Sequence, residues 1–212
     1  MNDLSWLRSR GYAEPSALKL VGDRYQLRQR QRVAVGRCAC AEARRVARAA
    51  KRVQAADVEG RVLAIDGLNV VTTIEVALAR GVLLLGRDQC MRDMASFHGS
   101  YRLVHETKPA LTILVDLVRA LRPTHTVVYI DRPVSNSGRL AEALRAAARA
   151  GEVGLEAETA DDVDGTLKRA EGVVASADSA ILDVCGAWLP LARLAVERHR
   201  DAMPPLWLVD LS

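Results

Sequence analysis

The fold class is decided by the stretch Val62-Leu63-Ala64-Ile65-Asp66-Gly67. A short, continuous apolar run that stops at a polar residue predicts a strand buried on both faces of a sheet. The same pattern, with an aspartate at its end, recurs downstream in residues 126–131, 172–178 and 206–210. Repeated strands of this kind are typical of a parallel sheet.

Helical stretches separate these strands, at about residues 107–121, 138–150, 162–170 and 179–199. Strands that alternate with helices predict a three-layer α/β domain, in which helices cover both faces of a parallel sheet. Ligands of such sheets bind outside the carboxyl ends of the strands. We therefore expect Asp66, Asp131 and Asp178 to converge at that edge, and the fourth strand would add Asp210.

Clustered carboxylates repel one another unless a cation lies among them. Carboxylate oxygens suit hard cations, so the pattern predicts a site for Mg²⁺ or Mn²⁺. The alternative for any single aspartate is an N-cap of the following helix.

Charge is divided unevenly along the 212 residues. Residues 1–60 hold thirteen Lys and Arg against six Asp and Glu, whereas residues 61–212 hold seventeen against twenty. We predict a basic helical N-terminal domain over residues 1–60, with helices near 16–35 and 39–55, ahead of an α/β domain over 61–212. A basic module beside an acidic site suits a polyanion such as RNA, although a solvated helix face is the alternative for the basic stretch.

Three classes of feature are disfavoured by composition. Aromatic residues make up only 4% of the chain, so we expect arginines, rather than aromatic rings that stack on bases, to hold a nucleic acid. The four cysteines lack zinc-site spacing, which favours reduced structural thiols and a cytoplasmic location. No stretch approaches the length of a membrane span, so no membrane association is expected. The sequence leaves homodimer formation open.

Several of these motifs together resemble a known superfamily. Ile65-Asp66-Gly67-Leu68-Asn69 resembles the opening signature of the PIN-like nucleases, especially their NYN branch. Residues 127–131 resemble the second acidic strand of that superfamily, residues 173–183 its last acidic motif, and Asp164 its further carboxylate. The resemblance covers about residues 61–190. The whole layout also resembles an uncharacterised prokaryotic family with a basic helical N-terminal domain.

The resemblance implies a PIN-like fold and metal-dependent hydrolysis of phosphodiesters. The catalytic residues that it implies are Asp66, Asn69, Asp131, Asp164 and Asp178, of which the four aspartates would hold the metal. Asn69 would orient a water or bind a phosphate oxygen, or act only as a turn residue. Ala180 stands where NYN enzymes often have a second acid. Which of Asp161, Asp162, Asp164 and Asp183 reach the metal is left open.

Further candidates lie outside these motifs. The candidates for nucleic-acid binding are Arg28, Arg30, Arg32, Arg92, Ser135 and Ser137. Asp93 is a candidate metal ligand, unless Arg92 and Asp93 form a buried pair that holds their loop. Ser137 would receive a phosphate at a helix N-terminus or act as a plain N-cap. His98 is a candidate general base, although a metal site does not require one.

The leading hypothesis is a metal-dependent ribonuclease whose Arg-rich N-terminal domain holds the RNA. The alternative is a non-catalytic RNA-binding or regulatory protein on the same scaffold. The sequence does not distinguish RNA from DNA, or endonuclease from exonuclease action. A phosphohydrolase of the haloacid dehalogenase kind is less consistent, because Leu68 stands where its acid/base aspartate belongs. No Gly-x-Gly-x-x-Gly or Gly-Lys-Ser/Thr motif for nucleotides occurs.

Overall fold

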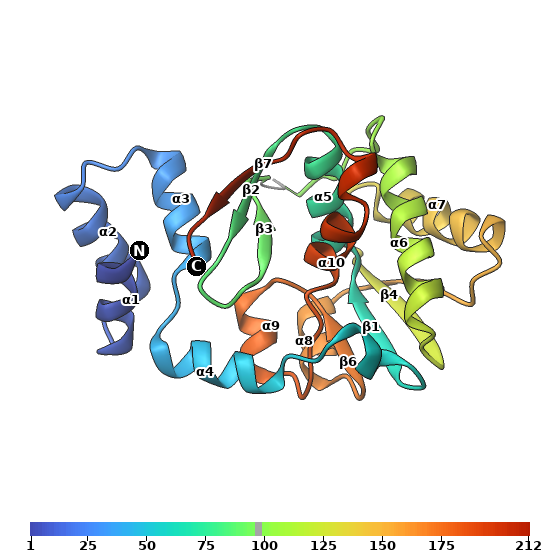
Figure 1. The fold of residues 1–212 in the computed structure, drawn as a ribbon, viewed down its shortest axis with the longest axis horizontal. Coiled ribbons are helices and arrows are strands. Elements are labelled where there is room, and N and C mark those ends of the chain that lie inside the picture. Colours follow the sequence, from blue (N-terminus) through green and yellow to red (C-terminus); the bar gives the residue numbers. More distant parts are fainter. Residues whose placement is uncertain (96–98) are drawn as a thin grey trace.

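A computed structural model describes residues 1–95 and 99–212 as a mixed α/β protein with a helical N-terminal region at one end (Figure 1). Its larger sheet has the strand order β5-β4-β1-β6, and every pairing in it is parallel. The strands are β1 (Val62–Asp66), β4 (His125–Asp131), β5 (Glu156–Ala160) and β6 (Val173–Ala175). The predicted parallel sheet is thus confirmed, and β1 lies between β4 and β6. The strand β5 was not predicted.

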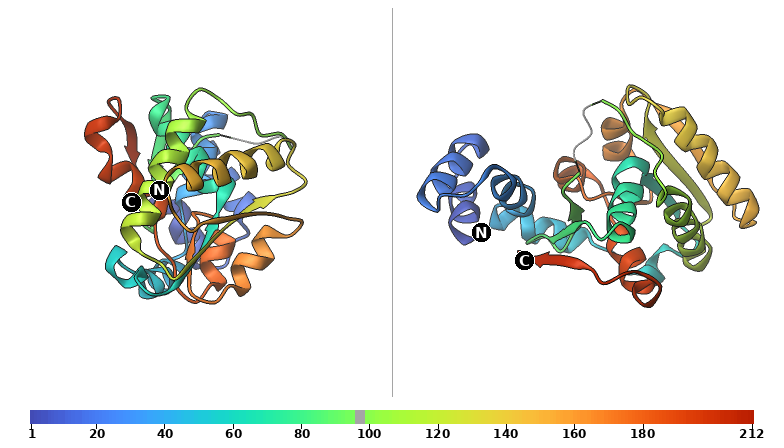
Figure 2. Two further views of the ribbon diagram at one scale, coloured as in Figure 1. Left: turned by 90° about the vertical axis from the view of Figure 1, so that its right-hand side faces the viewer. Right: turned by 90° about the horizontal axis from the view of Figure 1, so that it is seen from above.

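Helices cover both faces of this sheet (Figure 2). Leu63 and Ile65 of β1 belong to the larger core, whereas Ala64 points to the opposite side and packs in a second core with Trp188. This alternation follows from the twofold period of a strand. The larger core includes α5 (Gly67–Leu78), α6 (Thr107–Leu121), α7 (Ser137–Ala150) and α10 (Leu191–Arg198), and the second core includes α8 (Val163–Arg169) and α9 (Ser179–Val184).

A second, three-stranded sheet corrects one prediction. Its order is β3-β2-β7, formed by β3 (Met91–Asp93), β2 (Val82–Leu85) and β7 (Trp207–Asp210). The last strand therefore does not extend the larger sheet, and Asp210 instead accepts a hydrogen bond from the Ser212 amide at 2.9 Å. The free edge of β6 is already covered, because Val174 exchanges backbone hydrogen bonds with Ala187 and Leu189, both at 2.9 Å.

Two predicted helices are interrupted. The helix expected over 179–199 is divided into α9 and α10, and the helix expected over 16–35 is divided into α2 (Glu14–Arg24) and α3 (Gln29–Cys38). Gln26 takes the left-handed conformation, with φ of 50°, while the amides of Gln26 and Leu27 bond back to Asp23 and Gly22. This is a Schellman end, which stops α2 without a glycine.

The N-terminal region consists of two parts. Helix α1 (Asn2–Ser9), which was not predicted, packs with α2 and α3 around a small core of its own. Helix α4 (Glu42–Lys51) is shorter than the predicted 39–55 and packs against α9 of the α/β part. The short 3₁₀ helices η1 (Ala55–Val58) and η2 (Arg200–Ala202) complete the regular elements of the described residues.

All four cysteines are buried and free, as expected for structural thiols.

None of the helices in the described parts of the chain combines the length and the apolar character that crossing a bilayer requires.

A buried ion network joins α4 to the loop between β2 and β3. Asp88 accepts hydrogen bonds from Arg48 Nη1 at 2.6 Å and from both terminal nitrogens of Arg92 at 2.8 and 2.6 Å. Burial acts to raise the pKa of Asp88, but the two guanidinium groups hold it below the ordinary value. Arg92 also donates from Nε to the carbonyl of Ala177 at 3.0 Å, so the network reaches the residue before Asp178.

We expect Asp88→Ala to lower the free energy of unfolding by about 3 kcal/mol or more, because it leaves two guanidinium groups buried without their shared carboxylate. Asp116→Ala, which breaks the exposed pair with Arg119, is the matched control and should cost less than about 1 kcal/mol. Urea denaturation measures both values. Equal, small losses in the two variants would contradict the structural role of Asp88.

Candidate functional site

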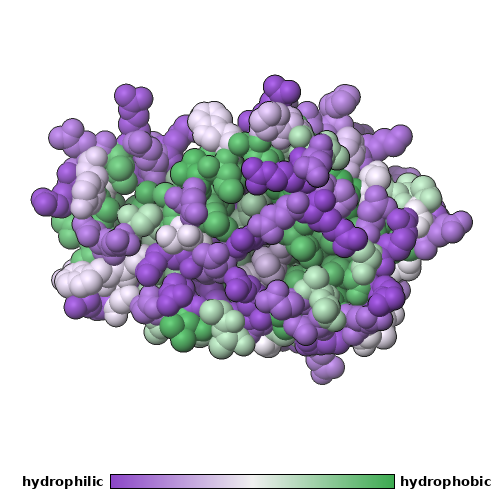
Figure 3. Space-filling view, viewed as in Figure 1, coloured by the Kyte–Doolittle hydropathy of each residue, from purple (hydrophilic) through white to green (hydrophobic). Residues whose placement is uncertain are grey.

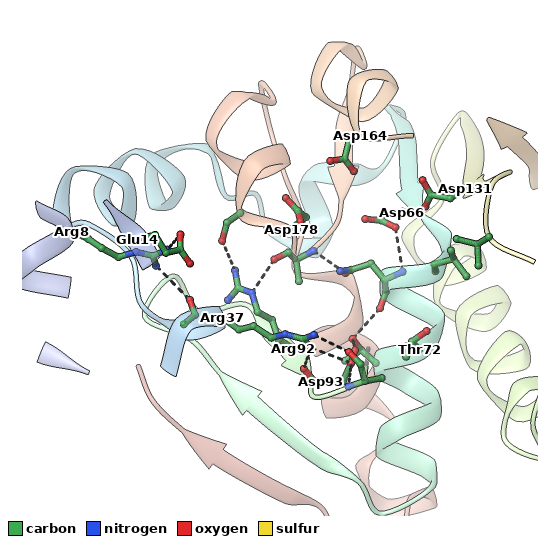
Figure 4. A pocket seen from close by; sticks show the side chains of 18 residues that line it. Arg8, Glu14, Arg37, Asp66, Thr72, Arg92, Asp93, Asp131, Asp164 and Asp178 are labelled. Carbon is green, nitrogen blue, oxygen red and sulfur yellow. Dashed lines mark hydrogen bonds and ion pairs between the residues drawn. The ribbon is translucent and has the colours of Figure 1, made fainter. Parts of the chain in front are cut away.

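A cavity of about 660 Å³ lies at the carboxyl ends of the larger sheet (Figure 4). Asp66 ends β1, Asp131 ends β4 and Asp178 follows β6. Because these three strands are neighbours, their last carboxylates line one cavity, as the strand pattern predicts. Asp164, at the start of α8, lines it from a further side. Asn69 and Asp93 also contribute to the wall.

Asp66 is the most buried of these acids, with 7% of its surface exposed. Its Oδ1 accepts from the Asn69 amide at 3.2 Å, and its Oδ2 accepts from Ser176 Oγ at 2.8 Å. Burial raises the pKa of Asp66 to about 7; these hydrogen bonds oppose the rise, and the charges of Asp131 and Asp178 add to it. At neutral pH this carboxyl group is therefore near its midpoint of ionisation.

Hydrogen bonds fix Asp66 relative to Asp178. The Asn69 side chain accepts from the Ala177 amide through Oδ1 at 2.9 Å, and Ser176 Oγ accepts from the Asp178 amide at 3.0 Å. Asp178 also caps α9, since its Oδ1 accepts from the amides of Ala180 and Ile181 at 2.6 and 3.3 Å. The cap expected as the alternative role of a strand-end aspartate is thus present, and Asp178 still lines the cavity.

Asp131 and Asp164 form the other acidic side. Burial raises the pKa of Asp131, and the charges of Asp164 and Asp162 add to the rise. Asp164 is exposed and lies 3.7 Å from the Lys168 ammonium.

The structure also answers which neighbouring acids reach the cavity. Asp161 pairs with Arg132 at 2.8 Å, and Asp162 caps α8 by accepting from the Gly165 amide at 2.8 Å. Asp183 pairs with Arg48 at 2.8 Å. Among these acids and Asp164, only Asp164 lines the cavity.

Thr72 was not identified from the sequence. Thr72 lines the same cavity, and its hydroxyl oxygen is buried and is one of few side-chain groups in residues 1–95 and 99–212 that have no hydrogen-bond partner. An unpaired buried hydroxyl costs about 1–3 kcal/mol unless a water or ligand meets it. The spacing in the sequence could have identified it, because Thr72 lies three residues after Asn69 and thus on the same face of α5.

The end of the cavity opposite Asp66 and Asp131 is lined by arginines. Arg8 of α1 and Arg37 of α3 come from the N-terminal helices, and Arg92 comes from β3 (Figure 4). Arg37 donates to the carbonyls of Asp93 and Ala95 at 2.6 and 2.9 Å, whereas Arg8 pairs with Glu14. Sequence reasoning singled out neither Arg8 nor Arg37, because their approach depends on how the N-terminal helices dock.

Arg92 and Asp93 do not pair with each other. The buried partner of Arg92 is Asp88, so the Arg92 guanidinium group is not free to bind a phosphate. Asp93 accepts from Thr73 Oγ1 and from the Ala95 amide, both at 2.8 Å, while it faces the cavity.

Five predicted nucleic-acid-binding residues do not line the cavity: Arg28, Arg30, Arg32, Ser135 and Ser137. Arg28 and Arg30 are exposed, whereas Arg32 pairs with Asp23 at 2.8 Å. Ser137 is buried and its hydroxyl donates to the Arg132 carbonyl at 3.4 Å, so it is not presented to a phosphate. Asn136, not Ser137, is the N-cap of α7. His98 lies outside the described residues.

No cluster of three or more His, Cys, Asp or Glu side chains with the spacing of a metal site occurs within residues 1–95 and 99–212. The four cavity aspartates therefore share a wall without closing into a coordination shell.

Fold and site together define a mixed α/β protein whose parallel sheet presents a carboxylate-lined cavity at its strand ends. The chain belongs to the family described as "Domain of unknown function (DUF5616)", which matches residues 55–194. Residues 1–51 match "Protein of unknown function (DUF434)", so the two matches meet between residues 51 and 55, ahead of the domain boundary predicted between residues 60 and 61.

One curated relative is similar over most of both chains. "Uncharacterized protein MJ0935" of Methanocaldococcus jannaschii is 28% identical over 180 residues, which cover 85% of this chain and 86% of the relative. No solved structure matches the chain.

We expect Asp66→Asn to stabilise the metal-free protein at high pH. The pKa of Asp66 is higher in the native state than in the unfolded chain. Ionisation of this group therefore lowers the free energy of unfolding as the pH rises from about 4 to about 7. Above about pH 7.5, with chelator present, the variant should gain roughly 2 kcal/mol over the parent protein, and near pH 4 the gain should disappear.

Urea denaturation at the two pH values measures this difference. Asp161→Asn, which changes an exposed carboxylate outside the cavity, is the control and should show no such pH-dependent gain. A destabilised Asp66→Asn variant at the higher pH would contradict the assigned burial of the charge.

Proposed function

We propose that this protein is a divalent-metal-dependent ribonuclease with a PIN-like fold. The observation that carries the proposal is the convergence of Asp66, Asp131, Asp164 and Asp178 on one cavity at the carboxyl ends of adjacent parallel strands. The residues that resemble the PIN-like signature lie on this wall, including Asn69. The PIN-like identity of the fold is part of the proposal, as is the choice of RNA.

In this proposal, Mg²⁺ or Mn²⁺ would draw the carboxylates of this wall together into a coordination shell. Carboxylate oxygens are the ligands that these ions prefer, and Asp66, Asp131, Asp164 and Asp178 would supply them. The raised pKa values of Asp66 and Asp131 reflect burial and neighbouring negative charge, which a cation would offset. When bound, the ion would lower the pKa of a water and neutralise charge on the scissile phosphate.

Residues of the chain would position the substrate. Asn69 uses Oδ1 to accept from the Ala177 amide, which leaves its Nδ2 group to donate to a phosphate oxygen or to the attacking water. The hydrogen bonds from Ala177 and Asp178 hold Asn69 and Ser176 in place, so these groups need not reorganise when substrate enters.

The arginines at the other end of the cavity favour a polyanion. Arg8 and Arg37 lie on the wall that faces the carboxylates, where phosphates of a bound strand would replace Glu14 at Arg8 and the backbone carbonyls at Arg37. Phosphate binding by such arginines is electrostatic and independent of base sequence. A nucleic-acid strand, with one phosphate at the carboxylates and others near the arginines, matches both ends.

We expect the purified protein to cleave an unstructured RNA in the presence of Mn²⁺ or Mg²⁺ and to stop when the ion is chelated. Asp66→Asn and Asp178→Asn should each lower the cleavage rate at least about a hundredfold, since each removes a charged metal ligand. Asp161→Asn, outside the cavity, should cleave at the parent rate. Gel analysis of labelled RNA measures the rates, and filter binding checks that the variants still bind RNA.

Cleavage that persists in chelator, or full activity in Asp66→Asn, would contradict the proposal. Tight RNA binding without cleavage under any divalent ion would instead favour a non-catalytic RNA-binding protein on this scaffold.

A further inference from the structure

The N-terminal helices expose all of their aromatic side chains. Residues 1–60 contain three aromatic residues, and Trp6, Tyr12 and Tyr25 are 53%, 53% and 55% exposed. In the α/β part, Trp188 and Tyr101 are fully buried, whereas Trp207 is 62% exposed. Large aromatic residues usually bury most of their surface in a core, so a set left at the surface marks an interaction site.

Trp6 borders a groove of about 410 Å³ between α1 and α2. Leu20, at 56% exposure, lies on the opposite helix, and Arg24 adds a guanidinium group to the same groove. The guanidinium carbon of Arg10 lies 3.6 Å from the centroid of the Trp6 ring. Figure 3 shows hydrophobic residues among hydrophilic ones on the surface of these helices. The groove is lined by Asn2, Asp3, Trp6, Leu7, Leu20, Val21 and Arg24.

The helices around this groove carry an excess of positive charge, since residues 1–32 hold seven Lys and Arg against three Asp and Glu. Asp23 pairs with Lys19 and Arg32, Glu14 pairs with Arg8, and Asp3 accepts a hydrogen bond from Tyr25 at 2.7 Å. Within the part of the chain that the structure describes, four arginines of α1–α3 and their connections have no ion pair with a carboxylate: Arg10, Arg24, Arg28 and Arg30.

An apolar, aromatic-edged groove beside arginines that have no carboxylate partner among the described residues matches one class of ligand. Single-stranded nucleic acids bind to aromatic rings through their bases and to arginines through their phosphates. A protein partner of ordinary composition would not require this excess of positive charge. A duplex would keep its bases stacked internally and away from Trp6.

We propose that the groove between α1 and α2 binds single-stranded RNA, with a base stacked at Trp6 and a phosphate at Arg24. The choice of RNA rests on the proposed nuclease function, whereas the stacking surface does not. The low aromatic content of the whole chain favours arginines alone as the grip, but the few aromatic residues of the N-terminal helices lie where they contact solvent.

The test is fluorescence anisotropy of a short, labelled, unstructured RNA with the full chain in chelator, so that binding is measured without cleavage. Trp6→Ala should weaken binding about tenfold, the effect expected for removing one stacking platform, and Trp6→Phe should restore most of the affinity. Trp207→Ala is the matched control, because Trp207 on β7 is 62% exposed but lies in the second sheet. It should leave the affinity unchanged.

Arg24→Gln provides a second variant that leaves the apolar side chains intact. It should weaken binding several-fold and reduce the slope of affinity against salt concentration, since one phosphate contact is lost. The duplex form of the same RNA should bind more weakly than the single strand.

Parent-like affinity in both Trp6→Ala and Arg24→Gln would overturn the inference. So would a groove that holds a second copy of the chain, in which case Trp6→Ala turns a dimer into a monomer in sedimentation equilibrium while RNA affinity stays the same. If the parent protein cleaves no RNA but Trp6→Ala loses RNA affinity, RNA binding in the groove would be supported and the proposed ribonuclease function would be contradicted.

Discussion

β1 pairs in parallel with β4 on one side and with β6 on the other, and this pairing determines where the acidic side chains lie. It places the carboxyl ends of three strands at one edge and brings Asp66, Asp131 and Asp178 to one cavity. Asp66 is buried there, so its charge costs free energy in the protein without a cation. A fold optimised for stability alone would not retain this group, and such unfavourable groups concentrate at functional sites.

The buried ion network connects the cavity wall to the N-terminal region. Arg92 connects Asp88 to the backbone at Ala177, and Arg48 connects the same aspartate to α4. The Trp188 indole also donates to the Arg48 carbonyl at 2.7 Å. The basic N-terminal region is therefore joined to the acidic part through buried side chains, and α1 and α3 bring Arg8 and Arg37 to the cavity. In the proposed function, this junction places positive charge beside the carboxylates.

Part of this arrangement was predictable from the sequence because it depends on local pattern. An apolar run followed by an aspartate identifies a strand end, and neighbouring strand ends bring Asp66, Asp131 and Asp178 together. The sequence has no comparable pattern that reveals contacts between residues far apart in the chain. Asp210 has the same local pattern but lies in the second sheet, because Ala187 and Leu189 already bond to the open edge of β6.

The same distinction explains the missed residues. Arg8 and Arg37 reach the cavity only through the docking of α1 and α3, which no spacing in the sequence reveals. Thr72 was within reach of a helical-face argument from Asn69. Ser137 follows a turn and begins α7, as a phosphate site would, yet its hydroxyl is bonded to the Arg132 carbonyl and is buried.

If the protein is a metal-dependent nuclease, the strand-end aspartates bind a divalent cation. An anomalous-difference map at the manganese edge, from crystals of the full chain soaked in Mn²⁺, detects such an ion. We expect a peak among Asp66, Asp131 and Asp178, and its loss in crystals of Asp66→Asn. A map with no peak at these carboxylates, from crystals in which they face open solvent channels, would show that they do not bind the ion.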